Sequence, residues 1–319
     1  MMNQLNRWPV WVIFGLGLIV LPFLIKDFRV FQLSLMLIYA IALLGLNILT
    51  GYGGQISLGH GAFYAIGGYC AAILMDRFGV PYLATIPVAA GVCFAAGILM
   101  GFPALRLGGH YLALATFALA LAMPQLLKFK HFEAFTGGVQ GIILMKPTPP
   151  VEFSLFGQPL SEDRWLYFMV LAVTVIMFVI ARNLLEGRIG RAIVAVRDQP
   201  IAAGALGVNL AVTKTITFGV SAAFTGVAGA LGAITVAFVA PDSFNVFLSI
   251  SFLVGVVVGG LASIPGAIFG AAFIQFVPNI ADQISKSAPW AVYGVFLIAL
   301  MYLAPNGIMG IINRRKKGI

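Results

Sequence analysis

Apolar and polar positions follow one another along this chain in long blocks. Continuous apolar runs recur from end to end, and a run of about 20 residues crosses a hydrocarbon core about 30 Å thick as an α-helix. The alternating segments of about ten residues that mark an outer-membrane β-barrel are absent. The pattern therefore predicts an all-α polytopic membrane protein with a single transmembrane domain, residues 1–319. The predicted crossings, about ten in number, are Val10–Ile25, Val30–Leu49, Ser57–Met75, Tyr82–Leu105, His110–Leu127, Trp165–Asn183, Thr215–Val239, Phe247–Leu261, Gly266–Ile280 and Trp290–Leu303.

Several of these crossings are short because glycine-rich stretches interrupt the apolar runs. The stretches are Gly51–Gly59, Arg106–Gly109 and Gly259–Gly266. Irregular backbone at such depth is tolerated only where protein shields it from lipid or where it lines a cavity. We therefore expect broken helices whose turns lie below the membrane surface.

The composition excludes a water-soluble fold. Hydrophobic residues make up 61% of the chain and charged residues only 9%, against roughly a quarter charged in a typical soluble domain. Cys70 and Cys93 both fall inside apolar runs, where a small buried side chain is the usual role and a disulfide framework is not expected.

The placement of charge predicts the orientation. The chain carries 19 basic and 10 acidic residues. With the amino terminus inside, eleven of the basic residues and two of the acidic ones collect at the inner face. The positive-inside rule then favours both termini at the cytoplasmic face. In this arrangement residues 184–214 form an inner loop and residues 304–319 a basic inner tail. Residues 128–164 form an outer segment, either a structured lid or docking surface or a passive connector.

The strongest local signal is the first glycine break, Gly51–Gly59, with the polar residues around it. Freed backbone groups and polar side chains beside a water-filled pathway can meet a polar solute, and the alternative is that the glycines merely let helices pack closely. His60 taken alone is better explained as a hydrogen-bonded interior residue than as a substrate ligand. The candidate pathway residues here are Asn47, Gly51, Gly53, Gly54, Gln55, Ser57, Gly59 and His60.

A second break, Gly259–Gly266, repeats part of this pattern. In both stretches a Gly-Gly pair is followed by Ser three residues on and by Phe nine residues on. The repetition is either chance or an internal repeat of the kind that transporter folds place around a central site. Small residues four apart also suit tight helix packing. Gly259, Gly260 and Ser263 are the candidate pathway residues of this break.

Candidate chemistry is sparse. No acidic or basic residue lies clearly mid-span, and the three histidines show no metal-ligand spacing. A P-loop and a nucleophile elbow are also absent from the sequence. We therefore expect no enzyme, no metal site and no bound cofactor, and any uphill transport must draw energy from a partner. A stand-alone secondary transporter or channel for a small polar solute is the alternative.

The inner loop, residues 184–214, holds the main cluster of charge. Asp198 or Gln199 is expected to cap a helix with Pro200 in its first turn, and Gly207 is expected to end it. A helix of about two turns is too short to be stable alone in water, so the membrane domain or a partner should brace it. The basic residues before it suit an interfacial helix; a solvated basic connector is the alternative.

These stretches together closely resemble the inner-membrane permease of branched-chain amino acid ABC importers, the LivM type of the hydrophobic amino acid uptake family. The resemblance covers most of the chain. Its motifs are LNILTGYGGQISLGHGAF around Asn47, RLGGHYLALATFA from Arg106, TGGVQGI from Thr136, GRIGRAIVAVRDQPIAAGALGVN in the inner loop and GGLASIPGAIFGAA from Gly259.

The resemblance implies a complex in a bacterial inner membrane. Its members would be a second, homologous permease subunit (LivH-like), two cytoplasmic ATP-binding subunits and a periplasmic solute-binding protein, with no nucleic acid. ATP would bind to the partners. A short cytoplasmic coupling helix would lie at Asp198–Gly207 and dock on an ATPase. The implied coupling residues are Glu186, Gly187, Gly190, Arg191, Arg197, Asp198, Pro200, Ala202, Ala205 and Gly207.

One motif departs from the family. The Tyr-x-Ala-x-x-Thr motif adds Tyr111 and Thr116 to the candidate pathway, but the Phe-Gly-Glu that often follows it is replaced here by an apolar run without a carboxylate. The substrate therefore stays open between branched-chain amino acids and other amino acids, amides, urea or aromatic acids.

Overall fold

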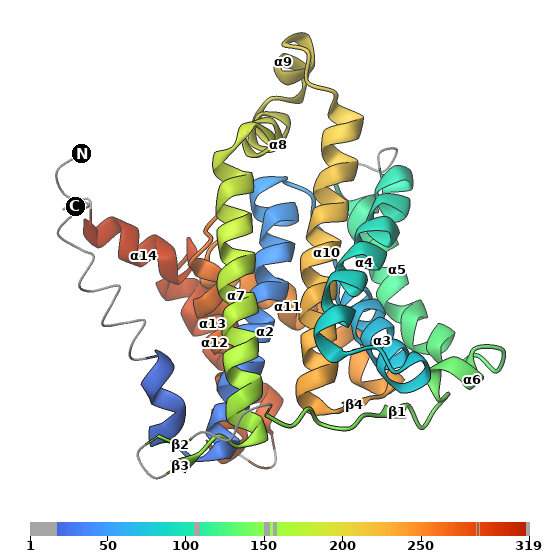
Figure 1. Cartoon of the computed structure of the whole chain (residues 1–319). Helices are drawn as coiled ribbons and strands as arrows, with labels where there is room; N and C mark the ends of the chain where they lie inside the picture. Colours follow the sequence, from blue (N-terminus) through green and yellow to red (C-terminus); the bar gives the residue numbers. More distant parts are fainter. Residues whose placement is uncertain are drawn as a thin grey trace.

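The protein is a bundle of long helices in the computed structural model, which describes residues 18–104, 109–149, 154–155, 158–284, 286 and 288–316 (Figure 1). Residues 18–24 are helical. The long helices are α2 (Asp27–Asn47), α3 (His60–Phe78), α4 (Tyr82–Ala104), α5 (His110–Leu127), α7 (Glu162–Glu186), α10 (Leu210–Val236), α11 (Val246–Gly259), α12 (Gly266–Ile284) and α13 (Pro289–Leu303).

Shorter elements connect them. They are the π-helix η2 (Ile48–Tyr52), α6 (Glu133–Thr136), α8 (Arg188–Asp198), α9 (Pro200–Ala205), the 3-10 helix η3 (Pro241–Phe244) and α14 (Gly307–Lys316). Four two-residue strands form two antiparallel pairs, which an all-helical prediction did not include. The pairs are β1 (Ile142–Ile143) with β4 (Phe238–Val239), and β2 (Ser154–Leu155) with β3 (Gln158–Pro159).

Helix α10 forms the centre of the bundle, where it packs against α2, α3 and α4. Its residues are buried almost without a break from Thr217 to Thr235, as expected of a helix that is apolar on all sides. Small residues allow this packing. A Cβ atom at Gly67 of α3 would lie 2.1 Å from the carbonyl oxygen of Gly226, so the two backbones touch there.

Every predicted crossing after the first forms a helix, but the predicted number of ten crossings is not confirmed. Among the described residues, six segments are long and apolar enough to cross a membrane: Asp27–Tyr52, Tyr82–Pro103, Glu162–Glu186, Leu210–Val236, Gly266–Ile284 and Ala291–Ile311. Two further apolar helices are shorter, Tyr111–Leu127 and Val246–Gly259. At 1.5 Å per residue a helix of 14 residues such as α11 reaches only about 21 Å. Most of the first predicted crossing, Val10–Ile25, lies outside the described residues.

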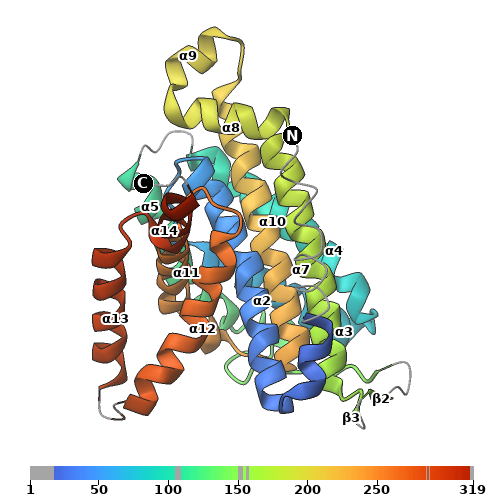
Figure 2. The ribbon, with the colours of Figure 1, turned by 90° about the vertical axis from the view of Figure 1, so that its left-hand side faces the viewer.

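The two ends of the bundle differ in structure and in charge pairing. Helices α8 and α9 project from one end, and α6 with the strand pairs covers the other (Figures 1 and 2). At the strand end, Lys128 pairs with Asp242 at 2.5 Å and Lys146 with Asp163 at 2.6 Å. The segment before α7 is thus tied to the bundle.

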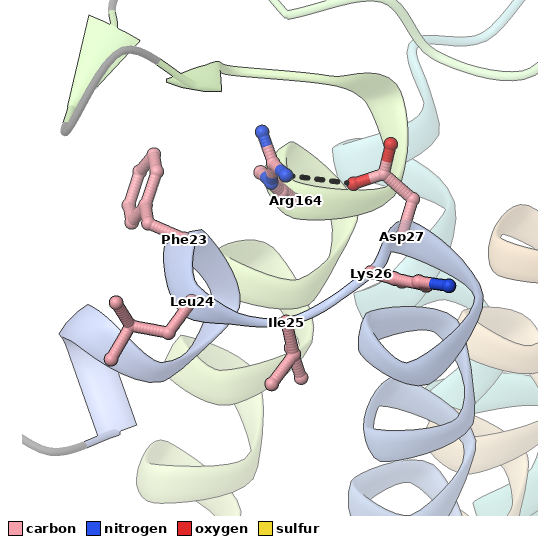
Figure 3. A pocket seen from close by; sticks show the side chains of 6 residues that line it. All are labelled: Phe23, Leu24, Ile25, Lys26, Asp27 and Arg164. Atoms are coloured by element: carbon pink, nitrogen blue, oxygen red, sulfur yellow. Dashed lines mark ion pairs between the residues drawn. The ribbon is translucent and has the colours of Figure 1, made fainter.

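Arg164 anchors the same end, where α7 meets the start of α2. Its side chain is buried, and its Nε donates to the carbonyl oxygen of Pro22 at 3.1 Å. Its Nη2 lies 3.2 Å from Oδ1 of Asp27, and its guanidinium lies over the ring of Phe23. Figure 3 shows this cluster beside a cavity of about 390 Å³. The cluster explains why a buried arginine is tolerated, because its charge is paired and hydrogen-bonded.

Strand β1 and helix α9 lie at opposite ends of the bundle (Figure 1). Met145 follows β1 by two residues and Ile201 belongs to α9, and the two residues are exposed by 92% and 88%. In a background with Cys70→Ala and Cys93→Ala, we expect Met145→Cys to react with a membrane-impermeant maleimide on intact cells. Ile201→Cys should react only after the membrane is opened. Labelling of both from the same side would contradict the arrangement of the helices, and the opposite order would reverse the predicted orientation.

Candidate functional site

The two glycine breaks lie side by side, and the side chain of Asn47 joins them. Asn47 ends α2 and is buried. Its Oδ1 accepts a hydrogen bond from the backbone N–H of Ala262 at 2.9 Å, and its Nδ2 donates to the carbonyl oxygen of Ser263 at 2.9 Å. Asn47 lies just before the first break, and its carboxamide thus satisfies two backbone groups of the second break.

Gly51 makes this approach possible. A Cβ atom there would lie 2.0 Å from Oδ1 of Asn47 and 2.4 Å from the backbone nitrogen of Ala262. The residue sits in η2, the single π-helical segment between α2 and the irregular backbone of residues 53–59. Such segments often occur at functional positions in helices. Gly51 is therefore required by contact between the breaks.

Hydroxyl groups from neighbouring helices satisfy the backbone at the start of α3. Thr116 Oγ1 of α5 accepts from the N–H of Leu58 at 2.9 Å, and Ser249 Oγ of α11 accepts from the N–H of Gly61 at 2.9 Å. The first N–H groups of a helix lack intrahelical partners, and inside a membrane no bulk water replaces them. Protein hydroxyl groups thus satisfy these backbone N–H groups without water.

His60 lies inside this structure with both ring nitrogens bonded. Ser221 Oγ donates to the carbonyl oxygen of Gly45 at 2.6 Å. A hydroxyl has one proton, so Ser221 accepts from His60 Nε2–H at 2.7 Å, and Nδ1 accepts from Ser57 Oγ–H at 3.0 Å. This tautomer leaves neither nitrogen free for a solute. The role of His60 is to hold the break against α2 and α10.

The remaining predicted pathway residues divide into two groups. Gly53, Gly54 and Gln55 lie with the break, where Gln55 Nε2 approaches the carbonyl oxygen of Lys214 at 3.5 Å. Tyr111 lies on the first turn of α5, where its side chain is 71% exposed. The predicted turn between α4 and α5 lies mostly outside the described residues.

The second break is tight at its glycines. The ideal Cβ of Gly259 would lie 2.1 Å from the carbonyl oxygen of Gly266. Gly260 has φ 114°, a value that favours glycine, and it ends α11. Ser263 Oγ accepts from the N–H of Gly266 at 3.3 Å at the start of α12. The close packing that was the alternative for these small residues is therefore present.

The predicted coupling segment forms two helices, α8 and α9, and α8 contacts the π-helix of the first break. Gly187 separates α7 from α8, and Gly190 lies where a Cβ would meet the carbonyl oxygen of Leu185 at 2.0 Å. Glu186 pairs with Arg182, and its carbonyl oxygen accepts from Arg191 Nη1 at 3.1 Å. The corner between α7 and α8 is thus sterically and electrostatically defined.

Helix α8 has one buried face, formed by Gly190, Ile193 and Val196, and its basic side chains lie elsewhere on the helix. It packs against η2 and α10. A helix is therefore present before the short one, as predicted, while its place at the membrane interface stays a prediction. Because α8 touches the π-helix, the coupling segment and the first break share a contact surface.

Helix α9 forms at the predicted position, and its N-cap is Gln199, one of the two predicted residues, but no side chain makes the capping hydrogen bond. Asp198 instead accepts from Arg197 Nε at 2.8 Å. That hydrogen bond holds the pKa of Asp198 below its usual value. Pro200 occupies the first turn as expected, and Gly207 has φ 86° just after the helix.

The two faces of α9 differ. Ala203 is buried, whereas Ala202 and Ala205 are exposed. Ile201 and Leu206 expose 88% and 86% of their surface. Apolar side chains therefore project from the end of the molecule.

A cavity of about 210 Å³ lies between the coupling segment and the first break. It carries two basic side chains among a largely glycine and apolar lining. The lining residues are Gly53, Gly54, Gln55, Ile56, Gly109, Leu112, Val196, Arg197, Pro200 and Lys214. Residues predicted for the pathway and for coupling thus meet at one surface. The described part of the chain holds no group of three or more His, Cys, Asp or Glu residues placed to bind a metal ion.

Comparison with known proteins assigns the family. The family model described as branched-chain amino acid transport system, permease component, matches residues 29–305. The chain belongs to this family. It is therefore a transport permease and a multi-pass membrane protein.

Individual relatives agree with the family model. The permease is 34% identical over 306 residues to the high-affinity branched-chain amino acid transport system permease protein LivM of Escherichia coli K12. The aligned residues make up 90% of this chain and 71% of the relative. It is 25% identical over 293 residues to BraD of Pseudomonas aeruginosa, a permease protein of a system with the same description, covering 85% and 91% of the two chains. No solved structure matches the permease.

Two residues of the site were missed from the sequence. Ser221 and Ser249 lie in α10 and α11, and both bond directly to the first break at His60 and Gly61. Each lies in a strongly apolar run, Ser221 between Thr217 and Thr225 and Ser249 two residues before Ser251. A buried hydroxyl in a membrane needs a partner, so these positions were a usable signal.

Gly51 and Gly91 give a matched test of the contact between the breaks. Gly51→Ala should lower the free energy of unfolding by about 1–3 kcal/mol, because its Cβ has no space beside Asn47 and Ala262. Gly91→Ala in α4 should cost nothing, since nothing lies within 4 Å of its Cβ. Thermal unfolding of both variants in detergent measures the difference. Equal stability would show that the breaks do not pack as described.

Proposed function

We propose that the permease is the membrane-spanning subunit of an ATP-binding cassette importer that carries branched-chain or related amino acids across a bacterial inner membrane. The observation that carries this proposal is the exposed apolar surface of α9, formed by Ile201 and Leu206. Apolar side chains at a polar end of the bundle favour burial by another protein. A stand-alone transporter or channel would leave this surface exposed to water.

The proposed partners follow from the same surface and from the family. Two cytoplasmic ATP-binding subunits bind and hydrolyse ATP, and one of them covers α9. A second, LivH-like permease subunit completes the pathway, and a periplasmic solute-binding protein delivers the amino acid at the strand end. Two facts support this division: the family is one component of a transport system, and the sequence has no P-loop. The permease itself needs no cofactor.

The proposed mechanism uses the contact between α8 and the first break. Closure of the ATPases on ATP displaces α9 and α8 together. Because α8 packs against η2 and α10, the displacement reaches the backbone around Gly51–Gly59. The two breaks are joined through Asn47, so they shift as one unit and switch access from the periplasm to the cytoplasm.

Ile201 provides the test of this docking surface. Ile201→Glu should remove the ATPase subunits from the purified complex and reduce uptake of leucine, isoleucine and valine at least tenfold, because a carboxylate on α9 cannot be buried in an apolar groove. Ile201→Leu keeps an apolar side chain and should retain both. Co-purification and uptake into cells measure the two effects. Normal uptake by Ile201→Glu would contradict the docking surface.

A further inference from the structure

Arg197, the last arginine of α8, reaches from the helix to the first break. Its Nη1 donates to the carbonyl oxygen of Gly51 at 2.8 Å, in the π-helix of the first break. Its Nε donates to Asp198 Oδ1 at 2.8 Å. The guanidinium is therefore held from both sides, with the carboxylate of its neighbour fixing its plane.

Gly54 allows the side chain of Arg197 to pass. A Cβ atom at Gly54 would lie 2.6 Å from Cγ of Arg197, and Gly54 has φ 66°, which favours glycine. The stem of the arginine thus packs directly on the backbone of the break. Arg197 contacts the first break at Gly51 and at Gly54. Two contacts three residues apart hold the position of α8 relative to the break.

The contact reaches both breaks. Gly51 lies against Asn47, whose carboxamide bonds to Ala262 and Ser263. A displacement of α8 that moves the carbonyl group of Gly51 therefore has a short, continuous route to the second break. The route consists of hydrogen bonds and a close backbone contact, with Arg197 as its link to the coupling segment.

We propose that Arg197 is a positioning residue that acts as a strut between the coupling helices and the two glycine breaks, and that it does not itself contact an ATPase. This inference rests on the proposed function. It assigns to Arg197 a task different from the docking surface of Ile201 and Leu206. The strut stays formed while α8 and the break move together.

The first experiment separates transmission from docking. In the full complex in proteoliposomes, Arg197→Ala should reduce uptake at least tenfold, while the ATPase subunits still co-purify and still hydrolyse ATP. Arg188→Ala is the matched control, an exposed arginine of the same helix, and should leave uptake unchanged. Wild-type uptake by Arg197→Ala would overturn the strut. Loss of the ATPase subunits from that variant would also overturn it, because Arg197 would then be a docking residue.

A disulfide can replace the strut. The ideal Cβ of Gly54 lies 3.6 Å from Cβ of Arg197, within the range of about 3.5–4.5 Å found in disulfides. In the background with Cys70→Ala and Cys93→Ala, the double variant Gly54→Cys and Arg197→Cys should transport faster when oxidised than after dithiothreitol is added, and faster than Gly54→Cys alone, which carries the same backbone strain. Each single variant should be impaired under both conditions.

The other outcomes of this experiment are equally decisive. Oxidised protein that transports more slowly than the same protein after reduction would show that the contact must break during transport, which overturns a strut. Failure of the bond to form would show that the two positions are not adjacent. Failure of the proposed function itself has a separate sign, since the unchanged permease would then purify without ATPase subunits and transport without ATP.

Discussion

A buried carboxamide holds the two interruptions of this bundle against each other. Asn47 gives an acceptor to Ala262 and a donor to Ser263, and Gly51 leaves the space in which these bonds form. Backbone groups freed at a break inside a membrane find no bulk water, so protein atoms must satisfy them. Because one side chain does this across two distant segments, the breaks form one unit and the helices around them are fixed relative to each other.

The first break is completed from three other helices. Hydroxyl groups of Thr116, Ser249 and Ser221 bond to it or to His60. The bonds satisfy the start of α3 and fix the tautomer of His60. The polar groups of the first break suggested contact with a solute, but many of them are hydrogen-bonded to other protein groups. The space beside it opens toward α8 and α9, in the cavity that Arg197 and Lys214 line.

Much of the secondary structure was predictable. Apolar runs placed the helices from α2 onward, since a span in lipid must be helical and continuous. Pro200 and Gly207 placed α9, because each has a strong positional preference at helix ends. Gln199 is the N-cap residue, as one of the two predicted alternatives had it, while Asp198 makes no capping bond because it has another partner, Arg197, next to it. The exposure of Tyr111 could not be read from its motif, because a motif does not show which side of a helix faces the bundle.

The sequence by itself determined that this chain crosses a membrane, where its helices and breaks lie, and which family it resembles, because composition, run length and local motifs are properties of neighbouring residues. The tertiary structure alone decided that the two breaks touch, that Ser221 and Ser249 complete the first one, and that Arg197 bonds to Gly51. These facts depend on residues such as Asn47 and Ser263 that are far apart in the chain, and only the packing of the helices brings them within hydrogen-bond distance.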